Sequence, residues 1–387
     1  MGVNTVGRAT SVLRVWHLRN TDRLGGPERL LLDQCVLAAP GIQYTLLSFD
    51  TGTKAHPFLD TAEKMGVTIR RVPARSSYDL KTFKALRKLF KEERPDVLVG
   101  HDYRADLCLA YSARGLGIPR VAVAHGYTGE NRKVRFFEFM DRRLLRKMDA
   151  VVVVSAPLRA RLEKAGVPPE RIHRIANAVD VTRIATAARK GRAPVRLGWK
   201  FDPEDRVLLC VGRLSPEKGQ DLLLDAFATW QSQPGCPRVH LVFVGDGALR
   251  PSLEARAKQL RMLGTRVFFA GWRSDPHACI GAADAIVLPS RTEGLPIVLL
   301  EAMAAQRPVL ATNVGDVAEV LDGGTYGGLV APGSVEAVTN ALPGLFTVTG
   351  QEKARQALTR VQQAYSAEGQ ARALEALYRQ VAAAREA

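Results

Sequence analysis

Short apolar runs alternate along the chain with longer segments in which apolar residues recur every three or four positions. The runs are rich in valine, isoleucine and leucine without interleaved polar residues, a pattern typical of parallel strands that are covered on both faces. We predict strands at 12–18, 44–49, 68–72, 96–99, 120–124 and 150–154, and again at 206–211, 239–244, 266–270, 285–289 and 308–312.

The intervening segments each carry one apolar stripe, which predicts amphipathic helices. We place helices at 27–38, 80–94, 104–116, 134–147, 220–230, 249–262 and 296–305, with a strongly helical tail from 351 onward. Segment 185–205 is rich in arginine, alanine, glycine and proline and is predicted to be a linker. The order of elements predicts an α/β protein with two doubly wound, Rossmann-like domains that bind ligands beyond the carboxyl ends of their strands.

The composition is that of a globular protein. The chain has 387 residues, of which 46% are hydrophobic and 24% charged, and this excludes an extended disordered chain. The five cysteines form no CxxC motif, so neither a disulfide framework nor a zinc site is expected, and a reducing cytoplasm fits. No apolar run approaches the roughly 18 residues of a membrane-spanning helix, and residues 1–12 lack the apolar core of a signal peptide.

The formal net charge of +16 is distributed unevenly. Residues 1–190 contain 34 Lys+Arg and 19 Asp+Glu, a net +15, whereas residues 191–387 contain 21 and 20, a net +1. This asymmetry indicates that the first half faces an anionic partner such as a membrane surface, a nucleic acid or a phosphorylated substrate. Nucleic acid is disfavoured, because only 6% of residues are aromatic and no known reader motif is present.

Two polar motifs follow predicted strands of the second half. Arg213 and Lys218 lie on the turn after strand 206–211, flanked by glycines. Two cations, backbone N–H groups and the N-terminus of the next helix can converge there on a diphosphate; a solvated basic loop is the alternative. Glu293 and Glu301 are separated by roughly 2.2 helical turns, so that both carboxylates can accept hydrogen bonds from ligand hydroxyls; two unrelated glutamates are the alternative.

Taken together, the motifs resemble those of the family-4 glycosyltransferases, which have the GT-B fold, and the resemblance covers nearly the whole chain. One departure is Ala178, at a position where many relatives have glycine. Pro27 suits the first turn of a helix. The matching segments are 25–29, 125–126, 149–155, 177–180, 212–214 with 218–219, 245–247 and 293–301.

The resemblance implies three parts of the chain. Residues 1–190 would form the acceptor-binding domain and residues 191–370 the donor-binding domain. Residues 371–387 would form a C-terminal helix that packs back toward the first domain.

The resemblance also implies roles for individual residues. Arg213 and Lys218 would hold the donor diphosphate and stabilise the leaving group. Glu293 would contact the donor sugar, and His125 would orient that sugar from across the cleft; a buried histidine capping a strand end is the alternative for His125. Glu301 would bind the ribose, and the backbone around Gly25, Gly26, Gly212, Gly294 and Leu295 would approach the donor.

The implied reaction is transfer of a sugar, with retention of its anomeric configuration, from a UDP-sugar or GDP-sugar to a glycan or lipid-linked acceptor. We expect no metal and no further cofactor, because no Asp-x-Asp motif is present. Asp102 follows a predicted strand and would face the cleft on the acceptor side, where it could help to deprotonate the acceptor; a helix cap is the alternative.

The basic helices at 80–94 and 134–147 place phenylalanine and leucine beside lysine and arginine, as interfacial helices do. We therefore expect the protein to bind peripherally to the inner face of the cytoplasmic membrane, with ordinary solvated helices as the alternative. A nicotinamide-dependent oxidoreductase is excluded, because loop 19–26 lacks Gly-x-Gly-x-x-Gly. A non-catalytic sugar-nucleotide-binding protein and a sugar-nucleotide epimerase stay open.

Overall fold

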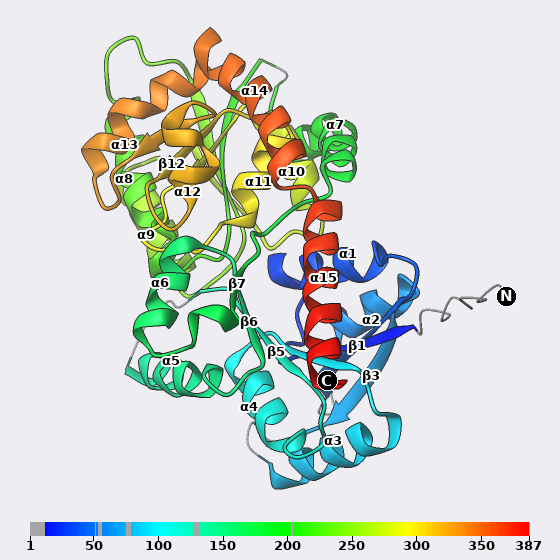
Figure 1. Cartoon of the computed structure of the whole chain (residues 1–387). Coiled ribbons are helices and arrows are strands. Elements are labelled where there is room, and N and C mark those ends of the chain that lie inside the picture. The colour runs from blue at the N-terminus through cyan, green and yellow to red at the C-terminus, as the bar shows by residue number, and fades with distance from the viewer. Residues whose placement is uncertain are drawn as a thin grey trace, which may run out of the picture.

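The computed structural model describes residues 12–50, 52, 56–74, 79–126, 132–202 and 204–386, with the backbone alone at 132–136 and 386. It contains two parallel sheets, each wound with helices on both faces, and the two units lie one above the other in Figure 1. The predicted α/β architecture with two Rossmann-like domains is therefore confirmed.

The first sheet has the strand order β3-β2-β1-β4-β5-β6-β7. The chain adds strands on one side of β1 and then, from β4 onward, on the other side, as in doubly wound sheets. Its strands are β1 (Leu13–Arg19), β2 (Ile42–Asp50), β3 (Thr68–Pro73), β4 (Val97–Gly100), β5 (Arg120–Ala124), β6 (Ala150–Val153) and β7 (Ile172–Arg174). Its helices are α1 (Gly26–Val36), α2 (Pro57–Lys64), α3 (Leu80–Glu93), α4 (Tyr103–Ser112), α5 (Arg132–Leu145) and α6 (Ala156–Lys164).

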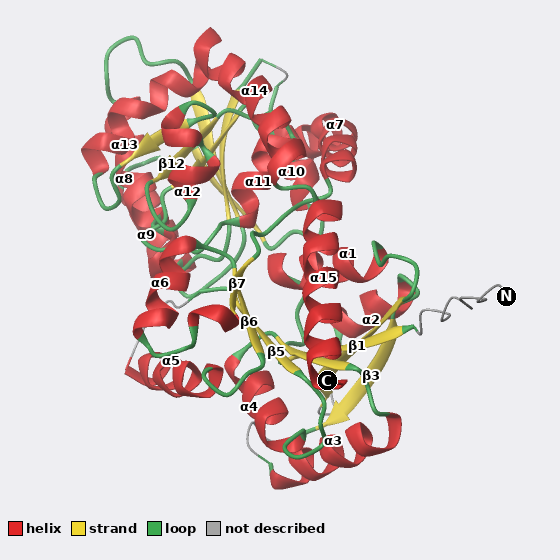
Figure 2. Cartoon of the chain, viewed as in Figure 1, coloured by secondary structure: helices red, strands yellow, loops and turns green. Residues whose placement is uncertain are grey.

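The second sheet has the order β10-β9-β8-β11-β12-β13. Its strands are β8 (Arg206–Val211), β9 (Val239–Val244), β10 (Val267–Gly271), β11 (Ala285–Leu288), β12 (Val309–Thr312) and β13 (Gly328–Val330). The remaining helices are α7 (Val181–Gly198), α8 (Gln220–Gln231), α9 (Arg250–Gln259), α10 (Pro276–Ala282), α11 (Ile297–Ala304), α12 (Val317–Val320), α13 (Val335–Ala341), α14 (Val348–Ala364) and α15 (Ala367–Glu386). Figure 2 shows these helices around the yellow strands.

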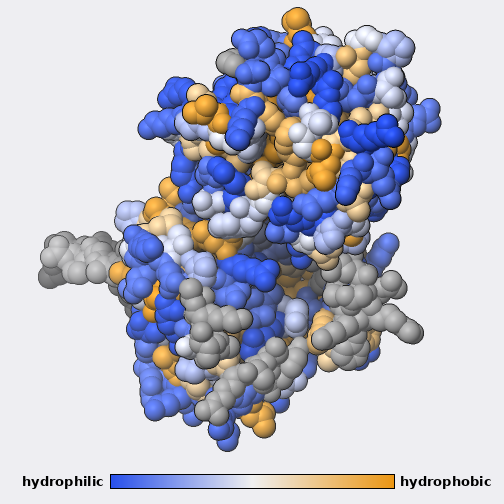
Figure 3. All heavy atoms as spheres, turned by 180° about the vertical axis from the view of Figure 1, so that it is seen from behind, coloured by the Kyte–Doolittle hydropathy of each residue, from blue (hydrophilic) through white to orange (hydrophobic). Residues whose placement is uncertain are grey.

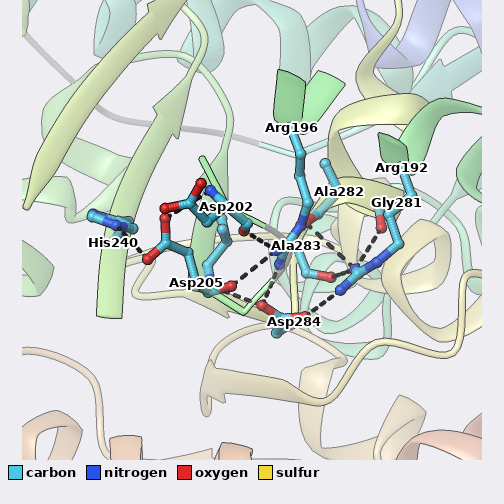
Figure 4. A network of polar contacts seen from close by, with 10 residues as sticks. Arg192, Arg196, Asp202, Asp205, His240, Gly281, Ala282, Ala283 and Asp284 are labelled. Atoms are coloured by element: carbon cyan, nitrogen blue, oxygen red, sulfur yellow. Dashed lines mark hydrogen bonds and ion pairs between the residues drawn. The ribbon is translucent and has the colours of Figure 1, made fainter. Parts of the chain in front are cut away.

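The linker predicted at 185–205 is wrong, because most of it is helix α7. Small residues let α7 cross α10 closely: a Cβ on Gly191 would lie 2.3 Å from the Cβ of Ala278. Two arginines of α7 then fix the helix to the second unit (Figure 4), since Arg192 and Arg196 donate to opposite oxygens of Asp284 at 2.7 and 2.6 Å. The boundary predicted between 190 and 191 accordingly falls inside a helix that packs on the second unit.

The C-terminal helix returns to the first unit, as predicted. In Figure 1 the red α15 descends from the second unit and lies beside α1. Its residues Leu374, Leu377 and Tyr378 are buried in the same cluster as strand residues Leu46 and Val99 of the first sheet. Burial of this apolar face holds the first unit and the end of the chain together.

Candidate active site

The two motifs predicted to bind a donor meet at one edge of the second sheet. β8 and β11 are adjacent and parallel, so the loops that follow them leave the same edge. Lys218 Nζ, on the loop after β8, donates to Glu293 Oε1, on the loop after β11, at 2.6 Å. Ser290 Oγ donates to the same carboxylate oxygen at 2.7 Å. This shared contact makes the two motifs a single site.

A glycine permits this meeting. Gly219 has φ 69°, and a Cβ there would lie 2.1 Å from the carbonyl oxygen of Pro289. Only glycine tolerates both the left-handed backbone and so close an approach. The loop after β8 therefore packs directly on the end of β11, which carries Lys218 to Glu293.

Arg213 is held by a neighbouring carboxylate. Its Nη2 donates to Glu217 Oε1 at 2.5 Å, and Ser215 Oγ donates to the same oxygen. Although burial opposes it, these hydrogen bonds hold the pKa of Glu217 below its usual value, so the carboxylate stays charged. The side chain of Arg213 is nevertheless 58% exposed, which leaves its guanidinium accessible to an anionic ligand.

Glu301 lies at the interface between the two units. It is buried on α11, and its Oε1 lies 2.9 Å from Nε2 of the buried His277 on α10. A small cavity lined by Glu301 and His277 is also lined by Gly26 and Arg29 of α1. The carboxylate predicted to bind ribose thus faces the glycine loop of the first unit.

The glycine loop of the first unit is itself held in place. Gly25 precedes α1, and its N–H donates to Glu28 Oε2 at 2.9 Å, while Arg19 Nε donates to Glu28 Oε1 at 2.7 Å. Pro27 occupies the first turn of α1. A Cβ on Gly26 would lie 3.2 Å from the Ile297 side chain of α11, so the loop packs against the donor half of the molecule.

The donor loop after β11 contacts the first unit through its backbone. A Cβ on Gly294 would lie 2.9 Å from the carbonyl oxygen of His125, which follows β5. The carbonyl of Leu295 accepts from Asn177 Nδ2 at 2.7 Å. Gly212 directly follows β8, and its N–H donates to the carbonyl of Val244, the last residue of β9, at 2.9 Å.

His125 is partly buried and belongs to a row of three histidines with the buried His17 and His101. Its ring stacks on His101 with centroids 6.0 Å apart, and His101 Nε2 lies 2.8 Å from His17 Nδ1. Burial lowers the pKa of His125 to about 3, so its imidazole is neutral near pH 7. Neither ring nitrogen of His125 has a hydrogen-bond partner within the described residues. The ring can therefore donate to one ligand atom and accept from another.

Comparison with known proteins identifies the family. Residues 24–183 match the family described as Glycosyltransferase Family 4, and residues 205–348 match the one described as Glycosyl transferases group 1. The chain belongs to the family-4 glycosyltransferases.

Relatives of this glycosyltransferase include two bacterial sugar transferases. The chain is 25% identical over 343 residues to the Escherichia coli UDP-Gal:alpha-D-GlcNAc-diphosphoundecaprenol alpha-1,3-galactosyltransferase, covering 86% of this chain and 87% of the relative. It is 34% identical over 235 residues to the alpha-D-kanosaminyltransferase of Streptomyces kanamyceticus, covering 57% and 59%.

The solved structures show the same GT-B fold. The crystal structure of Anabaena HepE in complex with UDP and glucose matches with a TM-score of 0.80, at 21% identity, over 95% of this chain and 100% of that one.

In this glycosyltransferase Asp102 caps a helix. Its Oδ1 accepts from the N–H groups of Arg104 and Ala105 at the start of α4, each at 3.0 Å, and its Oδ2 accepts from Asn20 N at 2.7 Å. Both oxygens thus hold backbone in place. Asp102 therefore has the role given as the alternative, a helix cap, and its carboxylate is not directed at an acceptor.

The sequence analysis gave no role to four residues that contact the site, because their partners are remote in the chain or because they lie within a longer motif. Glu217 sits inside the Arg213–Lys218 motif, where a carboxylate pairing with Arg213 at i+4 was a recognisable signal. The other three are His277, Asn177 and Asp316, which contact Glu301, Leu295 and Gly294 respectively.

Two features are absent from the part of the chain that the structure describes. No group of three or more histidine, cysteine, aspartate or glutamate side chains within them is arranged to hold a metal ion. No helix within them is both long and apolar enough to cross a bilayer.

Proposed function

We propose that this glycosyltransferase transfers a sugar, with retention, from a UDP-sugar or GDP-sugar to a hydroxyl group of a glycan or lipid-linked acceptor, without a metal ion. The supporting observation is the Lys218–Glu293 pair, which places a cation and a hydroxyl-binding carboxylate 2.6 Å apart at adjacent strand ends. The reaction would serve bacterial cell-surface or exopolysaccharide synthesis at the cytoplasmic side of the membrane.

The charges suit cleavage of a sugar–diphosphate bond. As the bond from the anomeric carbon breaks, negative charge develops on the diphosphate, and fixed cations stabilise that late charge. Lys218 and Arg213 supply two cations on one loop, in place of a divalent ion. Glu293 keeps Lys218 oriented and accepts hydrogen bonds from sugar hydroxyls.

His125 and the backbone of the donor loop favour attack from the front face. A neutral imidazole beside Gly294 orients a hydroxyl of the donor sugar. The acceptor oxygen then bonds to the anomeric carbon on the face from which the diphosphate departs. The carbon–oxygen bond to the diphosphate breaks, and the acceptor proton passes to the leaving phosphate oxygen. Each bond formed is matched by one broken, and the configuration is retained.

The names of the relatives support the substrate classes. The Escherichia coli relative is named for UDP-Gal and a diphosphoundecaprenol-linked acceptor, and HepE was crystallised with UDP. The net +15 of residues 1–190 suits an anionic, lipid-linked acceptor at a membrane surface.

A panel of UDP-sugars and GDP-sugars tests the proposal by release of nucleoside diphosphate, with and without EDTA. We expect release with one donor class, unaffected by EDTA, and a loss of about a hundredfold or more in Lys218→Ala and Glu293→Gln. Lys258→Ala, on the exposed face of α9, is the matched control and should retain full activity.

Four outcomes would contradict parts of the proposal. Binding of a nucleotide sugar with neither transfer nor hydrolysis would make the protein a non-catalytic binder. Epimerised nucleotide sugar as the product would make it an epimerase. Loss of activity in EDTA would overturn metal independence, and a product of inverted configuration in its NMR spectrum would overturn retention.

A further inference from the structure

One buried carboxylate bridges the two units beside the donor loop. Asp316 lies in the turn after β12 and is only 4% exposed. The turn belongs to the second unit, but the Asp316 side chain points into the first. A buried carboxylate is costly unless its oxygens are bonded, so its partners show what it does.

The carboxylate binds two elements of the first unit. The N–H of Ala156, the first residue of α6, lies 3.1 Å from each Asp316 oxygen. Arg174, the last residue of β7, donates from Nη2 to Asp316 Oδ2 at 2.7 Å. Burial raises the pKa of Asp316 above its usual value, and the contacts to a helix N-terminus and a guanidinium oppose that shift because both attract negative charge.

The backbone of the same turn binds the donor loop. Asp316 N donates to the carbonyl of Gly294 at 2.9 Å. The preceding Gly315 has φ 58°, and a Cβ there would lie 2.1 Å from the Gly294 carbonyl oxygen and 2.6 Å from that of Glu293. The turn therefore lies directly against the backbone of Glu293, which bears the proposed sugar-binding carboxylate, and of Gly294.

We propose that Asp316 is a positioning residue that couples closure of the two units to the geometry of the donor loop. Its side chain holds the first unit while its backbone holds Gly294, so the loop takes its working shape when the units are closed. Separation of the units breaks the contacts to Ala156 and Arg174 and releases the turn. The inference rests on the proposed transfer reaction, because it assigns Asp316 a role in that reaction's geometry.

Substitution of the carboxylate separates closure from donor binding. Asp316→Ala removes the contacts to the first unit but keeps the backbone bond to Gly294, and Asp316→Asn keeps the shape but removes the charge. We expect kcat to fall by about tenfold or more in Asp316→Ala and less in Asp316→Asn. The Kd for UDP or GDP, whichever the enzyme uses, should stay within about twofold of wild type, because the donor-binding unit is intact. A merely structural residue would not split kcat from nucleotide affinity.

Small-angle scattering of the full chain reports closure directly. We expect a larger radius of gyration for Asp316→Ala than for wild type, and Arg174→Ala should reproduce both the expansion and the loss of kcat. Glu319→Gln is the matched control, because Glu319 also pairs with Arg174 but is half exposed and has no contact to Ala156 among the described residues. It should leave kcat and scattering close to wild type.

The outcomes distinguish this inference from the proposed function. Wild-type kcat and wild-type scattering in Asp316→Ala would overturn the inference while the transfer reaction stands. Equal losses of kcat and nucleotide affinity in both Asp316 variants, with a lowered melting temperature, would show a merely structural residue and would also overturn it. Absence of transfer by the wild-type enzyme would refute the proposed function instead.

Discussion

Gly219 shows how much of the site depends on single backbone positions. Its left-handed conformation and its contact with the Pro289 carbonyl bring Lys218 within 2.6 Å of Glu293. The charged residues provide the chemistry, but they meet only because the residue between the loop and α8 lacks a Cβ.

Gly219→Ala should therefore impair transfer. The new Cβ would force the loop after β8 away from β11 and separate Lys218 from Glu293, so we expect kcat/KM to fall by about tenfold or more. The control is Gly264→Ala, because Gly264 also has positive φ, 74°, but no atom within 4 Å of a Cβ. It should cost about 1 kcal/mol of stability and leave kcat/KM unchanged. Equal activity losses in the two variants would argue against a loop-packing role for Gly219.

The buried His17 makes stability depend on pH. Burial lowers the pKa of His17 from 6.5 to about 3. As the pH falls below 6.5, His17 therefore binds a proton in the unfolded chain but stays neutral in the folded chain until about pH 3. Because of His17, the free energy of unfolding is highest above pH 6.5 and falls by about 1.4 kcal/mol per pH unit as the pH is lowered from 6.5 to 3. Urea unfolding of His17→Gln should show a correspondingly shallower decline. An unchanged slope would mean that His17 is protonated in the folded state.

At the scale of elements, α7 shows why composition misled the sequence analysis. Its alanines and glycines are typical of a linker, but in the structure they are the residues that allow two helices to cross closely. A Cβ on Gly281 of α10 would lie 1.9 Å from the carbonyl oxygen of Ala188, and one on Gly191 would meet Ala278. Arg192 and Arg196 of the same segment donate hydrogen bonds to Asp284 rather than pointing into solvent.

Two substitutions within α7 test this explanation. Alanine favours a helix over glycine by about 1 kcal/mol, so Gly198→Ala, with no atom within 4 Å of its Cβ, should leave stability unchanged or raise it. Gly191→Ala is the same substitution in the same helix but places a Cβ 2.3 Å from that of Ala278, and we expect it to lower the free energy of unfolding by about 1–3 kcal/mol. Chemical denaturation measures both. Stabilisation by Gly191→Ala would contradict the close crossing.

At the scale of the whole molecule, the charge excess collects on the first unit. Seen from behind, the lower half of the molecule, which is the first unit, is predominantly hydrophilic (Figure 3). In this unit α3, α4 and α5 pack side by side and carry exposed apolar residues among their basic ones. The exposed apolar side chains there are Leu80, Tyr103, Tyr111, Phe139 and Met140. Leu80 is 75% exposed although Leu86 and Phe90 of the same helix are buried, because it begins the helix before the first buried turn.

This surface predicts binding to anionic membranes. We expect the full chain to float with liposomes that contain anionic lipid and not with neutral ones, with each exposed lysine near the surface contributing about 1 kcal/mol. Reversal of charge in α3, by Lys84→Glu with Lys88→Glu, should reduce flotation, whereas Lys258→Glu in α9 of the second unit should not. Flotation that is independent of anionic lipid or of α3 would refute the prediction.

The sequence alone predicted much of the fold, because local patterns carry it. The runs at 206–211 and 239–244 coincide with β8 and β9, since a buried parallel strand is a continuous apolar run. The spacing of the glycine, arginine, lysine and glutamate motifs likewise placed Arg213, Lys218 and Glu293 at strand ends. The strand β7, with only three residues, and the short α6 were missed, because so few residues show no clear periodicity.

Only the tertiary structure decided which of these residues touch. The sequence left open whether Asp102 is a base that deprotonates the acceptor or a helix cap. In the structure, two N–H groups of the first turn of α4 donate to its Oδ1, so it is a helix cap. Asp316 and Arg174 are 142 residues apart and belong to no local pattern, yet they join the two units beside the donor loop. Local periodicity specifies helices, strands and motifs because these depend on interactions between residues that are near one another in the chain. Contacts between remote carboxylates, guanidinium groups and backbone amides depend on how the two units pack.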